Sequence, residues 1–134
     1  MPYGFGSRSA FDAFSSQANK ALLDAGATDA HVYLRGSSTT GYRYATGESI
    51  AVKGPGDLDL AVVSPELLAK ARQAGISIRG GGSRTMPIYD DQLPLLGLPG
   101  ATTGLSETAR RPVSIMIYAS EDAILARGDA ILLP

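Results

Sequence analysis

The chain has 134 residues, 44% of them hydrophobic and 19% charged, and a formal net charge of −1, which predicts one folded domain with a single core. The absence of cysteine excludes disulfides, thiolate zinc sites and thiol nucleophiles, and the single histidine, His31, excludes metal sites that need two imidazoles. No apolar run approaches the roughly 18 residues of a membrane helix, and the near-neutral charge argues against a domain that contacts nucleic acid over its whole surface.

The first part of the chain carries the pattern of an amphipathic helix followed by a strand. Ser9 is the expected N-cap, and apolar residues then recur at helical spacing as far as Gly26. We therefore expect a helix over residues 9–25. Residues 30–34 (AHVYL) are rich in β-forming side chains and run into the turn cluster RGSSTTG at 35–41, which predicts a strand that ends in a loop.

The middle of the chain contains the clearest strand and helix signals. Residues 41–56 mix Tyr, Gly and charged residues without a sustained period and predict a loop or an exposed hairpin. The run DLDLAVV at 57–63 predicts a strand. A helix is expected directly after it, because Ser64 is a typical N-cap, Pro65 fits the first helical position and Gly75 fits the terminator.

The next segment is dominated by turns. Residues 76–78 (ISI) predict a short strand that runs into the basic, glycine-rich loop RGGGSRT at 79–85. The long stretch from there to about residue 111 contains several prolines and glycines and predicts turns without regular structure.

The last quarter returns to regular elements. Alternating side chains in RPVSIMIYAS predict a strand, and Ser120 is the expected cap of a short helix that ends near Gly128. The tail AILLP is expected as a last strand or a packed extension. Strands and helices thus alternate without an internal repeat, which predicts that residues 1–134 form one α+β domain with a mixed β-sheet flanked by helices.

Two acidic residues on the central strand are the strongest chemical signal. Asp57 and Asp59 are two residues apart, so both side chains leave one face while the leucines beside them leave the other. Such like charges require open water or a cation between them, and Mg²⁺ takes one or two carboxylates plus substrate phosphates. Upstream, a turn at Gly36 and Ser37 offers backbone N–H groups and a hydroxyl to phosphate oxygens. Together these residues predict a phosphate and metal site; the alternative is a solvated strand end.

The run VYLRGSS followed by GDLDLAVV resembles the signature of the nucleotidyltransferase superfamily. The resemblance implies a nucleotidyltransferase-like palm in which Gly36 and Ser37 bind a nucleoside triphosphate (NTP), while Asp57 and Asp59 are catalytic and bind Mg²⁺. The family usually has a third carboxylate on a later strand, and RPVSIMIY contains no acid. The candidates that remain for the third carboxylate are Glu121, Asp122, Asp90 and Asp91.

A broader set of motifs, including GFGS, TGE, GISIRGGGSRT and RPVSIMIY, resembles the C-terminal toxin domains of bacterial polymorphic toxins with this core. The resemblance implies a toxin secreted as part of a larger protein, active in the cytoplasm of the target cell and neutralised by a cognate immunity protein. The implied reaction is Mg²⁺-dependent transfer of a nucleoside monophosphate from an NTP to a cellular acceptor. RNA, for example a tRNA end, is the preferred acceptor and a protein side chain the second, with no membrane partner.

Several other residues have two interpretations. Arg79 and Arg84 flank three glycines and are expected to bind the nucleotide or an RNA phosphate, or else to lie on a flexible surface loop. The alternatives for the whole chain are a nucleotide-binding domain of the same fold that has lost catalysis, and a glycine-rich protein-interaction module. The remaining residues that fit either a phosphate or base contact or an ordinary surface or core position are Arg35, Arg43, Lys53, Tyr42 and Tyr44.

Overall fold

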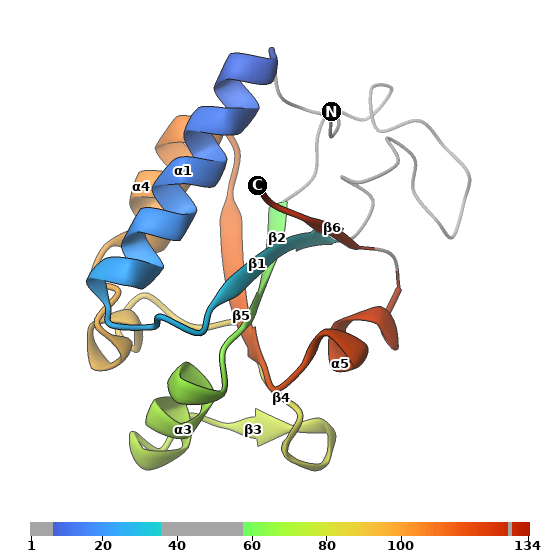
Figure 1. Ribbon diagram of the computed structural model, residues 1–134. Coiled ribbons are helices and arrows are strands. Elements are labelled where there is room, and N and C mark those ends of the chain that lie inside the picture. Colours follow the sequence, from blue (N-terminus) through green and yellow to red (C-terminus); the bar gives the residue numbers. More distant parts are fainter. Residues whose placement is uncertain (1–6, 36–57, 129) are drawn as a thin grey trace.

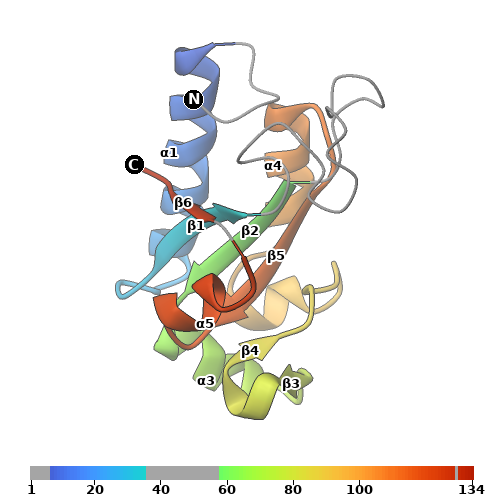
Figure 2. The same ribbon diagram turned by 90° about the vertical axis from the view of Figure 1, so that its right-hand side faces the viewer.

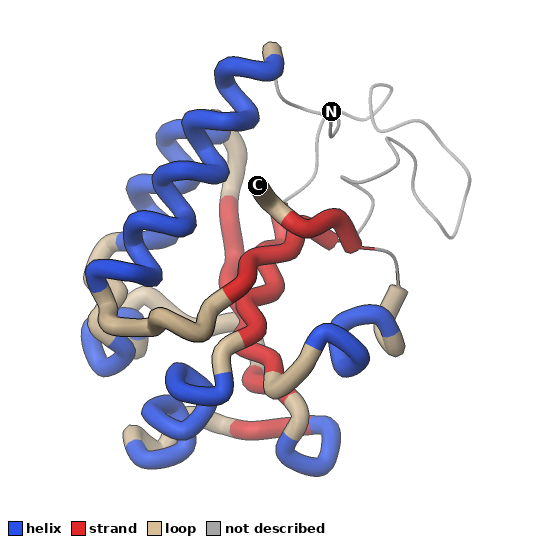
Figure 3. Tube along the Cα trace, in the orientation of Figure 1, coloured by secondary structure: helices blue, strands red, loops and turns tan. Residues whose placement is uncertain are grey.

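The structure is a computed structural model that describes residues 7–35, 58–128 and 130–134 (Figure 1). Its elements form an α+β arrangement in which helices flank a mixed six-stranded sheet (Figure 3). This agrees with the fold class expected from the sequence. The sequence predictions that lie outside the described ranges concern Gly36, Ser37, Arg43, Asp57, Lys53, Tyr42, Tyr44 and the loop or hairpin at 41–56.

The helices are short apart from the first. No helix within the described ranges has the length and apolar character to cross a bilayer. Short 3-10 turns occupy Gly80–Gly82 and Leu93–Leu96. The α-helices are α1 (Arg8–Asp24), α3 (Pro65–Gln73), α4 (Ala101–Ala109) and α5 (Glu121–Leu125).

The sheet has the strand order β3-β4-β5-β2-β1-β6. β1 is antiparallel to both β2 and β6, whereas β2 and β5 are parallel, so the sheet is mixed. The strands are β1 (His31–Arg35), β2 (Leu58–Val63), β3 (Ile78–Arg79), β4 (Arg84–Thr85), β5 (Val113–Tyr118) and β6 (Ala130–Leu132).

Helix α1 begins earlier than expected. Ser7, rather than Ser9, is the N-cap: its backbone is extended and its hydroxyl accepts a hydrogen bond from the Ala10 N–H at 3.1 Å. Ser9 lies inside the first turn, where its backbone is helical and cannot serve as a cap. The prediction of Ser9 as the cap was therefore wrong, although the helix and its buried face, with Phe14 at its centre, agree with the sequence pattern.

Helix α3 follows the expected capping chemistry. The Ser64 hydroxyl accepts from the Leu67 N–H at 3.0 Å, and Pro65 occupies the first turn, where its missing N–H costs nothing. Gly75 has a φ of +80° just after the helix, a conformation that favours glycine. This confirms the expected helix start and stop.

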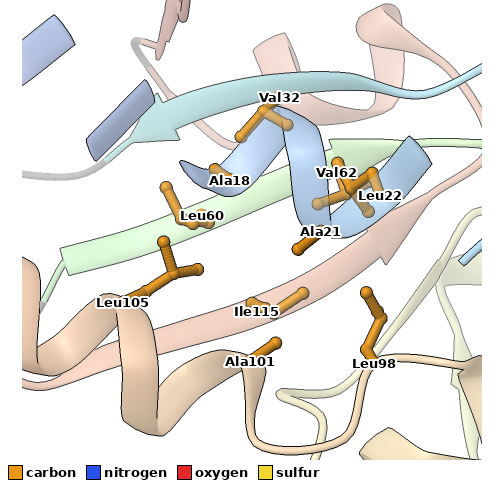
Figure 4. A pocket seen from close by; sticks show the side chains of 10 residues that line it. All are labelled: Ala18, Ala21, Leu22, Val32, Leu60, Val62, Leu98, Ala101, Leu105 and Ile115. Atoms are coloured by element: carbon orange, nitrogen blue, oxygen red, sulfur yellow. The ribbon is translucent and has the colours of Figure 1, made fainter. Parts of the chain in front are cut away.

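The two faces of β2 pack against different helices. Leu58, Leu60 and Val62 belong to the large core cluster beneath α1 and α4, and Figure 4 shows Leu60 and Val62 pointing toward side chains of these helices. On the opposite face Ala61 packs with residues of β5 and α5. Figure 1 shows α1 and α4 together on one side of the sheet and α5 on the other. The expected alternation of β2 is therefore confirmed.

Helix α4 lies in the stretch that was expected to contain only turns. Its N-cap is Gly100 in the left-handed conformation, and no side chain caps it. Glycine at position 104 and three threonines lower its intrinsic helix propensity, so local signals favour turns. Burial of Leu105 and Ala109 against the sheet outweighs that preference. The turn prediction was wrong here because tertiary packing decides this segment.

The C-terminal tail is both a strand and a packed extension. After β6, the Leu133 N–H donates to the Val32 carbonyl at 2.8 Å. The Pro134 carbonyl then accepts from the Ser15 hydroxyl of α1 at 2.6 Å. The tail therefore joins the edge of the sheet to the long helix.

Phe14 tests whether the α1 side of the sheet is the main core. Its side chain is fully buried, so we expect Phe14→Ala to lower the free energy of unfolding by about 3–5 kcal/mol. Leu23→Ala, on the same helix but 62% exposed, is the matched control and should change it by less than about 0.5 kcal/mol. Urea denaturation followed by circular dichroism measures both, and equal losses would contradict this assignment of the core.

Candidate functional site

Asp59 is the member of the acidic pair that the structure describes. It lies on β2 with its side chain on the α5 face of the sheet, and it is half-buried. The parallel register makes Ser114 of β5 its direct neighbour, and the Ser114 hydroxyl donates to Asp59 Oδ1 at 3.0 Å. The carboxylate is therefore oriented by a neutral donor and keeps its capacity to bind a cation.

Arg35 lies directly opposite Asp59 at the end of β1. Residues opposite each other in an antiparallel pair share a face, so the two charged side chains leave the same side of the sheet. Arg35 Nη2 nevertheless donates to the Arg127 carbonyl at 3.1 Å, and no ion pair joins Arg35 to Asp59. The buried Nε of Arg35 has no hydrogen-bond partner in the described part of the chain. A guanidinium and a carboxylate thus leave the same face at this strand end without forming an ion pair with each other.

Polar contacts connect α5 to the same face. Arg127 Nη1 donates to the Tyr118 hydroxyl at 2.7 Å, and the Tyr33 hydroxyl donates to Glu121 Oε2 at 2.9 Å. Burial raises the pKa of the Tyr33 phenol above its ordinary value, and the hydrogen bond and charge of Glu121 raise it further. Figure 2 shows α5 in front of the strands on this side. These contacts hold α5 against this face of the sheet, beside Tyr33 and Tyr118.

None of the candidates for a third carboxylate is adjacent to Asp59. The β5 residue beside Asp59 is Ser114, and Glu121 is engaged by Tyr33. Asp90 accepts from the Thr102 hydroxyl at 2.9 Å and lines a separate hollow of about 510 Å³ beside α4. Among the residues that the structure describes, no group of three or more acidic or histidine side chains is placed to hold a metal ion. All four candidates, Glu121, Asp122, Asp90 and Asp91, have exposed side chains.

The structure does not bring Arg79 and Arg84 together with Asp59. The expected loop is a tight hairpin of β3 and β4, in which Arg84 pairs with Tyr118 of β5. Asp59 pairs with Ser114, so four residues of β5, about 13 Å at the usual rise of a strand, separate the two positions. Figure 1 likewise shows β3 and β4 at the end of the sheet away from the start of β2. Arg79 and Arg84, which were expected to bind the nucleotide, therefore lie apart from Asp59 at the other end of β5.

Three features of this region were not expected from the sequence. Arg35 belongs to β1 instead of opening the turn cluster, which gives it a fixed position opposite Asp59. Ser114 is the polar residue in an otherwise apolar strand, a signal that could have marked it. The contacts of Arg127 with Arg35 and Tyr118 depend on how α5 packs against the sheet, and no local sequence pattern indicates that packing.

Comparison with known proteins finds no protein-family model, no curated protein and no solved structure that matches this chain.

The raised pKa of Tyr33 gives a pH-dependent prediction. A raised pKa means that the folded state favours the neutral phenol, so this stabilisation is complete below pH 10.0, the ordinary value, and is lost as the pH rises through the folded-state pKa. In an alkaline titration of phenolate absorbance, we expect Tyr33→Phe to remove one late-titrating group. The variant should also show a shallower loss of unfolding free energy above this pH. A titration curve in which only an early-titrating phenol disappears would contradict the assignment.

Proposed function

We propose that this chain is a Mg²⁺-dependent nucleotidyltransferase that moves a nucleoside monophosphate from an NTP to a hydroxyl of a cellular acceptor, preferably RNA. The observation that carries the proposal is the antiparallel pairing that puts Arg35 opposite Asp59. In the chain, Gly36 and Ser37 directly follow Arg35, and Asp57 precedes Asp59 by two residues. In the motif that the chain resembles, the acids lie on the next strand after the Gly-Ser turn, and here β2 follows β1 in the chain and pairs with it.

The donor chemistry at this strand end fits Mg²⁺. Asp59 is a half-buried carboxylate positioned by Ser114, and no described cation forms an ion pair with it. Asp57 and Asp59 would hold the ion, because Mg²⁺ prefers carboxylate oxygens and completes its shell with water and substrate phosphates. When bound, the ion would offset the negative charge of the triphosphate.

The residues of the chain would bind and orient the substrates. The guanidinium of Arg35 leaves the same face as Asp59 and can bind phosphate oxygens, and Gly36 and Ser37 would add backbone N–H groups and a hydroxyl. In the reaction, the acceptor oxygen forms a bond to the α-phosphorus and the bond from that phosphorus to the bridging oxygen breaks. Pyrophosphate leaves, and the acceptor hydroxyl loses its proton.

The broader resemblance supports a toxin domain within this proposal. Such a domain would be secreted as part of a larger protein and act in the cytoplasm of a target cell. A cognate immunity protein would neutralise it. Brief induction in a host cell is therefore the natural setting in which to identify the acceptor.

Asp59→Asn tests the proposed reaction. The asparagine oxygen can still accept from Ser114, so the fold should be retained, while the negative charge is lost. We expect transfer of label from an NTP radiolabelled at the α-phosphate to fall roughly 100-fold or more. Total RNA and total protein serve as acceptors, and toxicity on induction should fall in parallel.

The matched control is Asp24→Asn, which removes the same charge from the exposed end of α1. It should transfer label at the rate of the unchanged protein, and label at the γ-phosphate should not be transferred to the acceptor. Undiminished transfer or toxicity in folded Asp59→Asn would refute the proposed role of this carboxylate.

A second candidate function follows from Ser114, which stands beside Asp59 where a third carboxylate would be favoured for catalysis. A domain of the same fold that binds nucleotide without transfer, or that acts as a protein-interaction module, is compatible with this residue. A thermal-denaturation series with Mg²⁺ and NTP distinguishes the functions. We expect saturating ligand to raise the Tm by roughly 5 °C or more. A rise without transfer to any acceptor would favour the binding domain, and no rise would favour the interaction module.

A further inference from the structure

The β3–β4 hairpin gathers unpaired positive charge. Arg79 and Arg84 are direct partners in the antiparallel register and therefore leave the same side of the hairpin, while Thr85 on the other side is buried. Like charges directly opposite each other are destabilising, and no carboxylate among the described residues forms an ion pair with either. A bound polyanion would offset this repulsion.

A third arginine reaches the same turn from α3. Arg72 Nη2 lies 3.4 Å from the position that a Cβ would take at Gly82, so its guanidinium lies against the turn between the two strands. Gly81 and Gly82 have φ values of +68° and +97°, which favour glycine and leave the turn without side chains that could cover these cations. Arg72, Arg79 and Arg84 are hereafter the arginine patch.

A hollow with an exposed aromatic residue adjoins the arginine patch. Arg79 lines it together with Met86, Pro87 and Tyr89, and its volume is about 460 Å³. Tyr89 is 70% exposed, although its N–H is fixed by Gln92 Oε1 at 2.9 Å. An exposed ring on an ordered backbone offers a stacking surface for a base, and a hollow lined by apolar side chains and Arg79 suits a base and its phosphate.

We propose that the arginine patch and Tyr89 bind single-stranded polynucleotide, with phosphates on the arginines and a base on the tyrosine. An acidic protein segment would use the charges but not the ring and the hollow, and a duplex would hide its base faces from Tyr89. The chemistry therefore favours an unpaired strand.

The position of the arginine patch indicates that the bound polynucleotide is the acceptor of the transfer, an inference that rests on the proposed function. Arg84 and Asp59 pair with Tyr118 and Ser114, which lie on the same face of β5. The offset is about 13 Å along the strand and about 9.6 Å across it, because β4 and β2 lie on either side of β5. The resulting separation of about 16 Å corresponds to about five stacked nucleotides at 3.4 Å each. An RNA whose terminal hydroxyl lies beside Asp59 would then place a phosphate on the arginine patch about five nucleotides further along.

Fluorescence anisotropy tests the binding step without NTP or Mg²⁺. The probe is a dye-labelled single-stranded RNA of about a dozen nucleotides, within the usual range of such sites. We expect the double variant Arg79→Gln/Arg84→Gln to raise the Kd at least tenfold at low salt. It should also reduce the slope of log Kd against log salt by about 1.4, the value for two lost phosphate contacts on a single strand.

The matched charge control is Arg8→Gln/Lys20→Gln, which removes two positive charges from α1 and should leave the Kd within about twofold, since these residues lie away from the hairpin. Tyr89→Ala should raise the Kd roughly fivefold or more, whereas Tyr89→Phe keeps the ring and should bind normally. Unchanged circular dichroism and Tm verify folding. A DNA strand of the same sequence separates recognition of ribose from recognition of backbone and base faces.

The proposal is overturned if the arginine double variant binds the RNA as the unchanged protein does. It is also overturned if polyglutamate competes as well as RNA and Tyr89→Ala has no effect, which would indicate an acidic protein partner. Asp59→Asn should bind the RNA normally and fail to transfer label. RNA binding by the unchanged protein without any transfer would refute the proposed reaction alone. Transfer to RNA that is unaffected by loss of the arginines would refute the polynucleotide site alone.

Discussion

The parallel pairing of β2 with β5 is the constraint on which the rest of the structure depends. Two parallel neighbours cannot be joined by a hairpin, so the chain must cross from the end of one to the start of the other. The crossover contains α3, the β3–β4 hairpin and α4, which together cover one side of the sheet and extend its edge. The same pairing brings Ser114 beside Asp59, so the topology that builds the core also orients the carboxylate of the candidate site.

The two faces of the central strands divide packing from chemistry. The face beneath α1 and α4 is apolar along its length and contains most of the core. The face beside α5 is partly polar, and its hydrogen bonds join Tyr33 to Glu121 and Arg127 to Tyr118. A small helix leaves room for charged groups at the strand ends, which a face fully covered by long helices would not tolerate. The polar and charged groups of the candidate site therefore lie on the face with the smaller core cluster.

The elements predicted well are those whose local signals agree with their packing. α3 has its cap, its proline and its terminating glycine in place, and β2 alternates as its sequence indicates. α4 could not be predicted, because its glycines and threonines favour turns and only burial of residues such as Leu105 makes it a helix. For the site, spacing predicted that Asp59 leaves the face opposite the leucines. Its partners Arg35 and Ser114 depend on strand order, which no local pattern contains.

The distance between the arginine patch and Asp59 has a physical consequence for both. Arginines placed next to Asp59 would form ion pairs, and the carboxylate would then bind a cation less strongly. At about 16 Å the separation is twice the Debye length of about 8 Å at physiological ionic strength, so the attraction between the two groups through solvent is largely screened. Arg35 is the exception, and its guanidinium is directed to the Arg127 carbonyl instead of the carboxylate. The sheet therefore keeps Arg79 and Arg84 apart from Asp59, so that neither the patch nor the carboxylate is neutralised by the other.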